Sequence, residues 1–460
     1  MKRYRLFLII AAGLVAITCA TLIVYNKRLD KDLKSQLFIP RDTIMSGEIA
    51  LLQQYIRIDT QNPPGNEIRG AQFLGAQLAK YGIHYEIIES APGRASIYAR
   101  IKGKNPGSGL LLLHHIDVVP ATNKGWTRPP FTGTIFLNQL YGRGALDMKS
   151  IGICQLLAFI DVAKSHRIPE HDLVLLGVAD EETGGSLGTA WLLAHRPDIF
   201  EGIAYALNEG GITETQKEKL SYFGIELGSK MAMKVRVRAS SRDAILRARI
   251  ALEPSIGSDV PERVLPEVKA FLQDIAPQRL EQRALLEDVD RTIAEGKFWL
   301  LQRGYRELTR NIVWPGGPVE DHGSWTMDVH MFNLPDEQPD ARLAWLRQTV
   351  APSGATIDTV ISSMGPAPIS SRNTPMYRLI EQQVKSVYGD VPVGSEILAA
   401  SFNDSRYLRA HGIAAYGMWP FRVDFFQSQG IHGTDERIRT DWFQQGVTLM
   451  RRLVSTYSYS

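Results

Sequence analysis

Cysteine is nearly absent from this sequence. Only Cys19 and Cys154 occur among its 460 residues, too few for a disulfide framework or for a thiolate zinc cluster. Any metal site in the chain must therefore use histidine and carboxylate side chains.

The chain also lacks an excess of charge of either sign. Its formal net charge of +3 is close to neutral for this length, and it has no basic stripe with interleaved aromatic residues and no glycine-rich phosphate loop. We therefore expect no nucleic-acid partner. Hydrophobic residues make up 44% of the chain and charged residues 22%, which suits two domains with cores of their own.

One long hydrophobic run stands at the N-terminus. Residues 6–25 carry no charge and are flanked by lysine and arginine on both sides. About twenty such residues are enough to cross a bilayer as a helix. We predict an uncleaved single-pass signal anchor over residues 1–29, a polar stalk over 30–46 and a catalytic body outside the cytoplasm. The alternative is a cleaved signal peptide and a secreted or periplasmic protein, because residues 16–21 include small side chains.

The first site candidate follows a strongly apolar strand. Residues 110–113 are four leucines, as expected of a strand buried on both faces in a parallel sheet. His115 and Asp117 come next, and residues two apart in a strand face the same side. A carboxylate commonly orients a metal-binding imidazole. The alternative is a histidine that simply closes a strand end.

Acidic groups follow two further predicted strands. The adjacent Glu181 and Glu182 follow the strand predicted over residues 173–178, and Glu209 follows the strand predicted over 204–207. Carboxyl ends of parallel strands meet at one edge of a sheet, where ligands bind. Acidic residues at such positions also serve as helix caps, so no single one of them indicates a site. Their occurrence at the ends of successive strands does.

Taken together, the candidates form a ligand set for two metal ions. Two imidazoles and several carboxylates can hold a pair of zinc-like ions that share one carboxylate. Of two adjacent glutamates, one can bind metal while the other stays free as a base. The candidate residues are His115, Asp117, Asp147, Glu181, Glu182, Glu209 and His432.

The alternation of buried strands and helices in the sequence stops near residue 230 and resumes near residue 366. We predict an α/β fold with a mixed, mostly parallel sheet flanked by helices, in which residues 47–229 and 366–460 form the catalytic domain. Between them, residues 230–365 form a smaller α+β insertion with two alternating strands and a charged helical region over residues 261–309.

The order of these motifs resembles the aminoacylase and glutamate carboxypeptidase family of co-catalytic dizinc exopeptidases, and within it the Gly-X carboxypeptidase and N-acyl-amino-acid hydrolase branch. The shared motifs, in order, are His-x-Asp-Val-Val-Pro, Tyr-Gly-Arg-Gly-x-x-Asp-x-Lys, Glu-Glu-x-Gly-Gly, Asn-Glu-Gly and a final His-Gly with Asp-Glu. The resemblance implies a zinc exopeptidase fold with an inserted lid and dimerisation domain.

The resemblance also implies a role for each candidate. Two zinc ions, with Co²⁺ or Mn²⁺ as substitutes, would be held by His115, Asp147, Glu182, Glu209 and His432, with Asp147 bridging. Glu181 would be the general base and Asp117 the partner of His115. Arg406 would receive the α-carboxylate of the substrate, for which a guanidinium fork is well suited.

The insertion departs from the family pattern. The family histidine in Gly-His-x-Ser-x-Pro is absent, and residues 237–244 run directly into a helix. His322 can replace it or be a solvated loop residue; we favour the second. A lost oxyanion donor typically costs about 2.7–4 kcal/mol in the transition state, so slow turnover or an unusual substrate is expected. Whether the insertion still forms a homodimer is left open.

The predicted function is metal-dependent hydrolysis of amide bonds in small peptides or N-acyl amino acids that bear a free α-carboxylate. The alternative is a membrane-anchored family member with an impaired lid that acts as a binding or scaffold protein. Because such a scaffold has no need for a base, Glu181 favours the enzyme. A shift to aminopeptidase specificity is a third interpretation, against which Arg406 and Glu209 weigh.

Overall fold

The structure is a computed structural model that describes residues 46–460, apart from residues 212, 217, 254–260, 262, 367, 399 and 400. The predicted signal anchor (residues 1–29) and nearly all of the predicted stalk (30–46) lie outside these residues. Within the described part of the chain, no helix combines the length and apolarity needed to span a bilayer.

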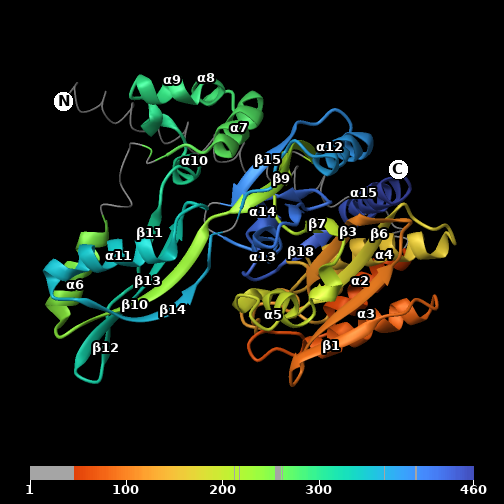
Figure 1. The fold of residues 1–460 in the computed structure, drawn as a ribbon, viewed down its shortest axis with the longest axis horizontal. Helices are drawn as coiled ribbons and strands as arrows, with labels where there is room; N and C mark the ends of the chain where they lie inside the picture. The colour runs from red at the N-terminus through yellow and green to blue at the C-terminus, as the bar shows by residue number, and fades with distance from the viewer. Residues whose placement is uncertain are drawn as a thin grey trace, which may run out of the picture.

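A mixed ten-stranded sheet forms the larger part of the molecule (Figure 1). Its order is β1-β2-β6-β3-β7-β16-β9-β8-β17, with β15 added to β9. The central strands β6, β3, β7 and β16 are parallel, whereas β1, β2 and β6 pair antiparallel at one edge. The strands are β1 (Glu86–Ala91), β2 (Arg94–Ile101), β3 (Asn105–His115), β6 (His171–Val178), β7 (Ile203–Asn208), β8 (Thr213–Gln216), β9 (Lys219–Ser229), β15 (Val393–Leu398), β16 (Ala414–Gly417) and β17 (Val423–Asp424).

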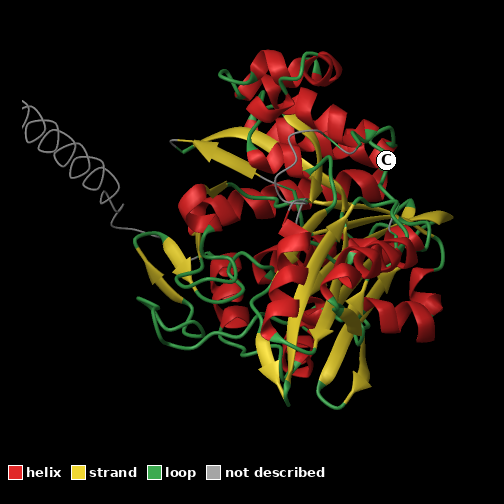
Figure 2. Cartoon of the chain, turned by 90° about the vertical axis from the view of Figure 1, so that its left-hand side faces the viewer, coloured by secondary structure: helices red, strands yellow, loops and turns green. Residues whose placement is uncertain are grey.

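Helices cover both faces of this sheet, and Figure 2 shows them on either side of the strands. The four leucines of β3 explain the arrangement, because Leu110 and Leu112 pack into one core while Leu111 and Leu113 pack into another. The first core contains helices α2 (Gly47–Ile56), α3 (Glu67–Ala79), α4 (Lys149–Lys164), α12 (Pro375–Tyr388) and α15 (Thr440–Tyr459); the second contains residues of α5 (Thr189–His195) and α13 (Ser405–Ala410). The predicted mixed α/β sheet with flanking helices is confirmed.

The register of the central strands places three carboxyl ends at one edge. His115 pairs with Val178 of β6, and Leu112 pairs with Leu207 of β7. The residues that follow these strands therefore share one edge of the sheet. A small sheet of β4 (Thr134–Phe136), β5 (Gln139–Tyr141) and β18 (Arg437–Arg439) links the loops around that edge.

A second, antiparallel sheet has a core of its own. Its order is β11-β13-β10-β14, with β12 on β13, and helices α6 (Arg242–Leu252) and α11 (Pro339–Val350) contribute apolar side chains to its core. The strands are β10 (Met231–Ala239), β11 (Ile312–Pro315), β12 (Val319–Asp321), β13 (Ser324–Asn333) and β14 (Thr356–Ser363). These elements lie within the predicted insertion and are α+β in character.

The charged helical region of the insertion consists of short helices. They are α7 (Pro266–Ile275), α8 (Arg283–Glu287), α9 (Val289–Ala294) and α10 (Arg303–Glu307). Pro277 follows α7, and Gly296, in a left-handed conformation, follows α9; neither residue favours a continuing helix. Because α7 packs on β15 and Phe271 and Leu272 join the core of the large sheet, the insertion divides its residues between two cores. Its domain boundaries stay a prediction.

Candidate metal centre

Three neighbouring strands deliver the first site residues. His115 is the last residue of β3, Glu209 directly follows β7, and Glu181 and Glu182 begin the short 3-10 helix η1 (Glu181–Thr183) after β6. Since these strands are parallel neighbours, all four side chains stand at the same sheet edge. The structure brings together the residues that the sequence motifs singled out.

Asp147 lies between two imidazoles. Its Oδ1 is 3.0 Å from Nε2 of His115, and its Oδ2 is 3.0 Å from Nε2 of His432. Each imidazole also faces a second carboxylate: Oε1 of Glu209 is 3.6 Å from His115 Nε2, and Oε2 of Glu182 is 3.2 Å from His432 Nε2. The site therefore consists of two groups of donors that share one carboxylate.

The electrostatics of this cluster are strained by crowding of like charges. Burial and the nearby Asp147 charge raise the pKa of Glu209 to about 8 and that of Glu182 to about 6. Burial opposes ionisation of Asp147, but hydrogen bonds from both histidines lower its pKa below the usual range. Hydrogen bonds to Asp147 and Glu182 raise the pKa of His432 to about 10. Protons on the histidines and glutamates thus balance charge that cations would otherwise neutralise.

The donor set fits a pair of zinc-like ions. Ligand atoms of His115, Asp147 and Glu182 lie within 4.8 Å of one another, and so do those of His115, Glu181 and Glu209. Nitrogen and carboxylate oxygen donors suit zinc, which favours a small number of such ligands. Cys154 is a buried residue of α4 and is not among these donors.

Glu181 is the candidate base. Burial and the charge of Glu209 raise its pKa well above the ordinary value. Its side chain lines the same cavity as Asp147, Glu182, Glu209 and His432. A carboxylate whose pKa is raised is a stronger base than an ordinary glutamate.

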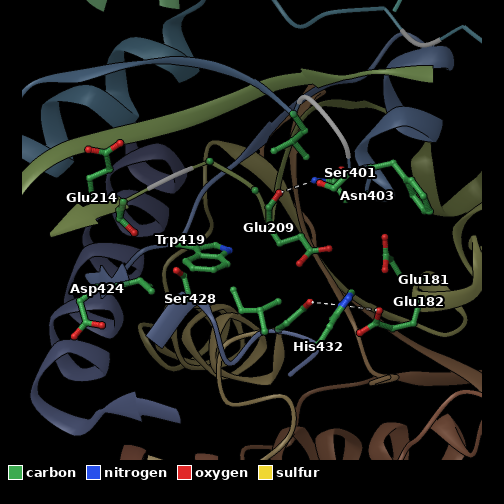
Figure 3. A pocket seen from close by; sticks show the side chains of 18 of the residues that line it. Glu181, Glu182, Glu209, Glu214, Ser401, Asn403, Trp419, Asp424, Ser428 and His432 are labelled. Carbon is green, nitrogen blue, oxygen red and sulfur yellow. Dashed lines mark hydrogen bonds and ion pairs between the residues drawn. The ribbon is translucent and has the colours of Figure 1, made fainter. Parts of the chain in front are cut away.

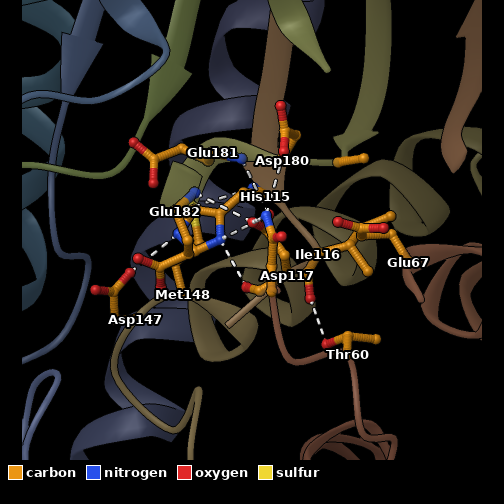
Figure 4. A network of polar contacts seen from close by, with 12 residues as sticks. Thr60, Glu67, His115, Ile116, Asp117, Asp147, Met148, Asp180, Glu181 and Glu182 are labelled. Carbon is orange, nitrogen blue, oxygen red and sulfur yellow. Dashed lines mark hydrogen bonds and ion pairs between the residues drawn. The ribbon is translucent and has the colours of Figure 1, made fainter. Parts of the chain in front are cut away.

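Asp117 plays a broader part than the sequence indicated. The main-chain oxygen of Asp117, at 2.9 Å, accepts the hydrogen bond from Nδ1 of His115, whereas the Asp117 carboxylate is 3.7 Å away. That carboxylate instead accepts the amide N–H groups of Glu181 and Glu182, at 3.2 and 3.1 Å. Figure 4 shows Asp117 beside His115, with the two glutamates nearby. It therefore fixes both the imidazole and the turn that follows β6.

Sequence reasoning assigned no role to Glu436, although it stands in the last motif. Its fully buried carboxylate accepts the amide N–H groups of Leu146 and Asp147, at 2.7 and 3.1 Å, and forms an ion pair of 2.7 Å with Arg143. Because Glu436 follows His432 on one loop, it ties that loop to the backbone of Asp147. Only its place beside the histidine motif could have signalled this role.

Arg406 lies beside the site and is not among the residues that line the cavity. Its Nη2 donates to the main-chain oxygen of Gly184 at 2.8 Å, and its guanidinium stacks on Phe402 and Tyr407. The Nε and Nη1 groups are buried without a hydrogen-bond partner. Recognition of a carboxylate by Arg406 remains a prediction.

His322 does not line the cavity either. It is at the turn between β12 and β13, and its side chain is 99% exposed. This position agrees with a solvated loop residue.

The donors stand at one end of a cavity of about 650 Å³. Figure 3 shows Glu181, Glu182, Glu209 and His432 on one side, with Glu214 and Asp424 on the opposite side and Trp419 between them. The apolar members of the cavity wall are Leu398, Phe402, Trp419, Val423 and Ile431. The cavity has room for a small peptide or acylated amino acid next to the donors.

The α/β fold and the two groups of candidate metal donors at one sheet edge are those of a metal-dependent hydrolase, and comparison with known proteins identifies the family. The sequence model of Peptidase family M20/M25/M40 matches residues 111–456. The chain belongs to this family, which confirms the predicted resemblance and the predicted enzyme class of metallopeptidase or aminoacylase.

Individual relatives agree with this placement. Aminoacylase-1 from Homo sapiens is 27% identical over 418 residues, which cover 88% of this chain and 94% of the relative. The crystal structure of an M20 family metallo-carboxypeptidase from Sulfolobus solfataricus matches with a TM-score of 0.68 at 17% identity, over 90% of this chain and 100% of that one. Human carnosine dipeptidase 1 matches with a TM-score of 0.66 at 14% identity, over 89% and 96%. The two structures support the fold.

Proposed function

We propose that this protein hydrolyses the amide bond of small peptides or N-acyl amino acids with a free α-carboxylate, and that it does so with two zinc ions, for which Co²⁺ or Mn²⁺ can substitute. The observation that carries the proposal is the position of Asp147, whose two oxygens each face a different imidazole at 3.0 Å. A carboxylate so placed suits a bridge between two ions. No finding supports the alternative of a membrane-anchored scaffold.

The residues divide the work by position. His115 and Glu209 would hold one ion, His432 and Glu182 the other, and Asp147 both. Bound zinc supplies Lewis acidity, which polarises the scissile carbonyl and makes water a stronger nucleophile. Glu181 takes the proton from the attacking water and delivers it to the leaving amine nitrogen. Asp117 keeps the His115 ring and the Glu181 backbone in place during this transfer.

The cavity supports an apolar group on the substrate. Trp419, Phe402 and Leu398 contribute to its wall, and burial of such surface favours binding by about 25 cal/mol per Å². Among the described lining residues there is no lysine or arginine. A side chain that pairs with the substrate's carboxylate would therefore come from the residues packed just behind the cavity wall. The unpartnered Nε and Nη1 of Arg406 support that residue as the cation.

We also propose the cellular setting that the sequence predicts. An anchor over residues 1–29 would hold the catalytic body outside the cytoplasm, with a cleaved signal peptide as the alternative; the uncharged run of residues 6–25 supports either. A homodimer through the insertion is likewise proposed from the family resemblance alone.

Hydrolysis by the purified, zinc-loaded protein tests the function. An N-acyl amino acid with an apolar side chain should be cleaved, the activity should disappear with a chelator, and zinc should restore it. The same substrate as its C-terminal amide should be cleaved more slowly. Chelator-resistant hydrolysis, or none of any N-acyl amino acid or dipeptide, would contradict the proposal.

A further inference from the structure

A buried polar network lies behind the turn that carries Glu181 and Glu182. Its centre is Asp180, which precedes the pair in a left-handed conformation. The Asp180 carboxylate accepts hydrogen bonds from Thr183 Oγ1 at 2.6 Å, Ser186 Oγ at 3.0 Å and the amide of Leu187 at 2.9 Å. The turn over residues 180–187 is therefore wrapped around one carboxylate.

Arg94 anchors that carboxylate to the rest of the domain. It is the first residue of β2, and its Nη2 lies 2.7 Å from Asp180 Oδ1 and 2.8 Å from Glu67 Oε1. Its Nε donates to the other oxygen of Glu67 at 2.8 Å. Glu67 begins α3 and is fully buried, so the guanidinium bridges two carboxylates from different elements.

Asn62 makes a second connection to the same turn. Its Nδ2 donates to Asp117 Oδ2 at 2.9 Å and to Thr183 Oγ1 at 3.0 Å, with Asp180 Oδ1 at 3.3 Å. Asp117 in turn accepts the amides of Glu181 and Glu182. Figure 4 shows Asp117, Asp180 and the glutamate pair together, with Glu67 to one side.

The loop of Asn62 is also fitted to Arg94. A Cβ atom at Gly65 would lie 2.2 Å from Nε of Arg94, and the φ of Gly65 is +81°. Glycine adopts this conformation at low cost and lets the backbone approach the guanidinium closely. Asn62, Glu67 and Arg94 all precede residue 111, where the match to the family begins.

We propose that Arg94 and Asn62 are positioning residues for Glu181, and this proposal rests on the proposed function. Their contacts fix the turn from behind and reach none of the five proposed metal ligands through their side chains. Glu182 is on the same turn, but its carboxylate also accepts the amide N–H of Val119 and contacts His432. Loss of Arg94 or Asn62 should therefore displace the Glu181 carboxyl group relative to the substrate while both ions stay bound. The loss of turnover should therefore lie in the proton-transfer step, separate from any loss of stability and without loss of metal.

Arg94→Lys is the test, and the chain offers a matched control. Arg100 stands on the same strand, and its ion pair with Asp172 is also nearly buried, at 2.8 Å. Asp172 is at the amino end of β6, whereas Asp180 follows its carboxyl end. Lysine keeps the charge at each position but loses the planar fork, so Arg100→Lys reports the general cost of this change away from the site.

The expected result is a split between the two variants. Both should lose similar thermal stability, but only Arg94→Lys should lower kcat, by roughly tenfold to a hundredfold, the order expected when a catalytic group moves by about an Å. KM and zinc content should stay close to wild type. Methylguanidinium should restore part of kcat in Arg94→Ala and leave Arg100→Ala unchanged.

Other outcomes would overturn the proposal. They are equal kcat in Arg94→Lys and Arg100→Lys, or loss of zinc from Arg94→Lys. If Arg94→Lys does not fold, Asn62→Ala replaces it, since it leaves no buried charge unpaired, and an unchanged kcat in that variant would reject the network. A wild type that hydrolyses no amide contradicts the proposed function itself, and the positioning role with it; an active wild type with unaffected variants contradicts only the positioning role.

Discussion

Asp147 and Glu181 have different proposed roles: Asp147 binds the metal ions, and Glu181 transfers the proton. Asp147 faces both imidazoles, so Asp147→Ala should lose both ions. Glu181 stands with His115 and Glu209 but is not one of the five proposed ligands, so Glu181→Ala should keep the ions and lose turnover by about a hundredfold or more, within the usual range for a general base. Metal analysis of both purified variants checks this. An empty Glu181→Ala protein would show that the assignment of roles within the glutamate pair is wrong.

Zinc binding should depend strongly on pH. Without metal, Glu209 and Glu182 keep protons up to pKa values of about 8 and about 6, and His432 up to about 10. Zinc needs these groups deprotonated, so binding must release protons, and affinity should rise as the pH increases from 6 to 8. Calorimetry in buffers of different ionisation enthalpy measures the release. A pH-independent affinity over that window would mean that the cluster does not bind the metal.

Carboxylate recognition by Arg406 is tested by Arg406→Lys. The ammonium keeps the charge but loses the parallel N–H groups that position the scissile bond. We expect kcat/KM for an N-acyl amino acid to fall by about a hundredfold, with little change for its C-terminal amide. An equal loss for both substrates would assign Arg406 a structural role through Gly184 and Tyr407.

At the scale of elements, the loop before α4 depends on a residue nearly three hundred positions later. Glu436→Gln leaves the buried Arg143 without its carboxylate partner, with only main-chain oxygens such as that of Gly433 to accept from it, and presents an amide donor to backbone N–H groups. Breaking such a pair typically costs about 3–5 kcal/mol, and a displaced Asp147 should weaken zinc binding by about tenfold to a hundredfold. Denaturant unfolding and zinc titration measure the two effects. Asp172→Asn, at the opposite end of β6, should lower stability without changing zinc affinity.

The distance along the chain between two contacting residues decides whether the sequence could predict the contact. The apolar run at Leu110 and the residues just past each strand are local signals, so the central strands and the donors at their ends follow from sequence order alone. The contacts of Asn62 with Asp117, and of Glu436 with Leu146, join positions 55 and 290 residues apart. No periodicity or spacing marks such pairs, because tertiary packing creates them.

The insertion shows the other limit. Its many charged residues predicted helices, but they did not predict which sheet each helix packs on, because that depends on which apolar faces meet. Val268 and Leu272 of α7 are buried in the core of the large sheet, although they lie in the middle of the inserted segment. A hydrophobic stripe indicates that one face of a helix is buried, but it does not indicate which sheet buries that face.

At the scale of the whole molecule, the uncharged run of residues 6–25 is separated from the first site motif at His115 by a polar stalk, and we predict that it serves as an anchor and not as part of the catalytic fold. Removal of residues 1–29 should therefore leave a folded, zinc-binding enzyme whose kcat equals that of the full chain. In intact cells without an outer barrier, external protease should reach the full-length body. A protected body would put it in the cytoplasm, and an unfolded truncated protein would make the N-terminal segment part of the fold.

The central claim is that two ions share Asp147 at the carboxyl ends of β3, β6 and β7. Anomalous diffraction at the zinc edge from crystals of the purified protein tests it most directly. The predicted result is two peaks, one between Asp147 Oδ1, His115 and Glu209 and one between Asp147 Oδ2, His432 and Glu182. A single peak, or two peaks away from Asp147, would contradict it.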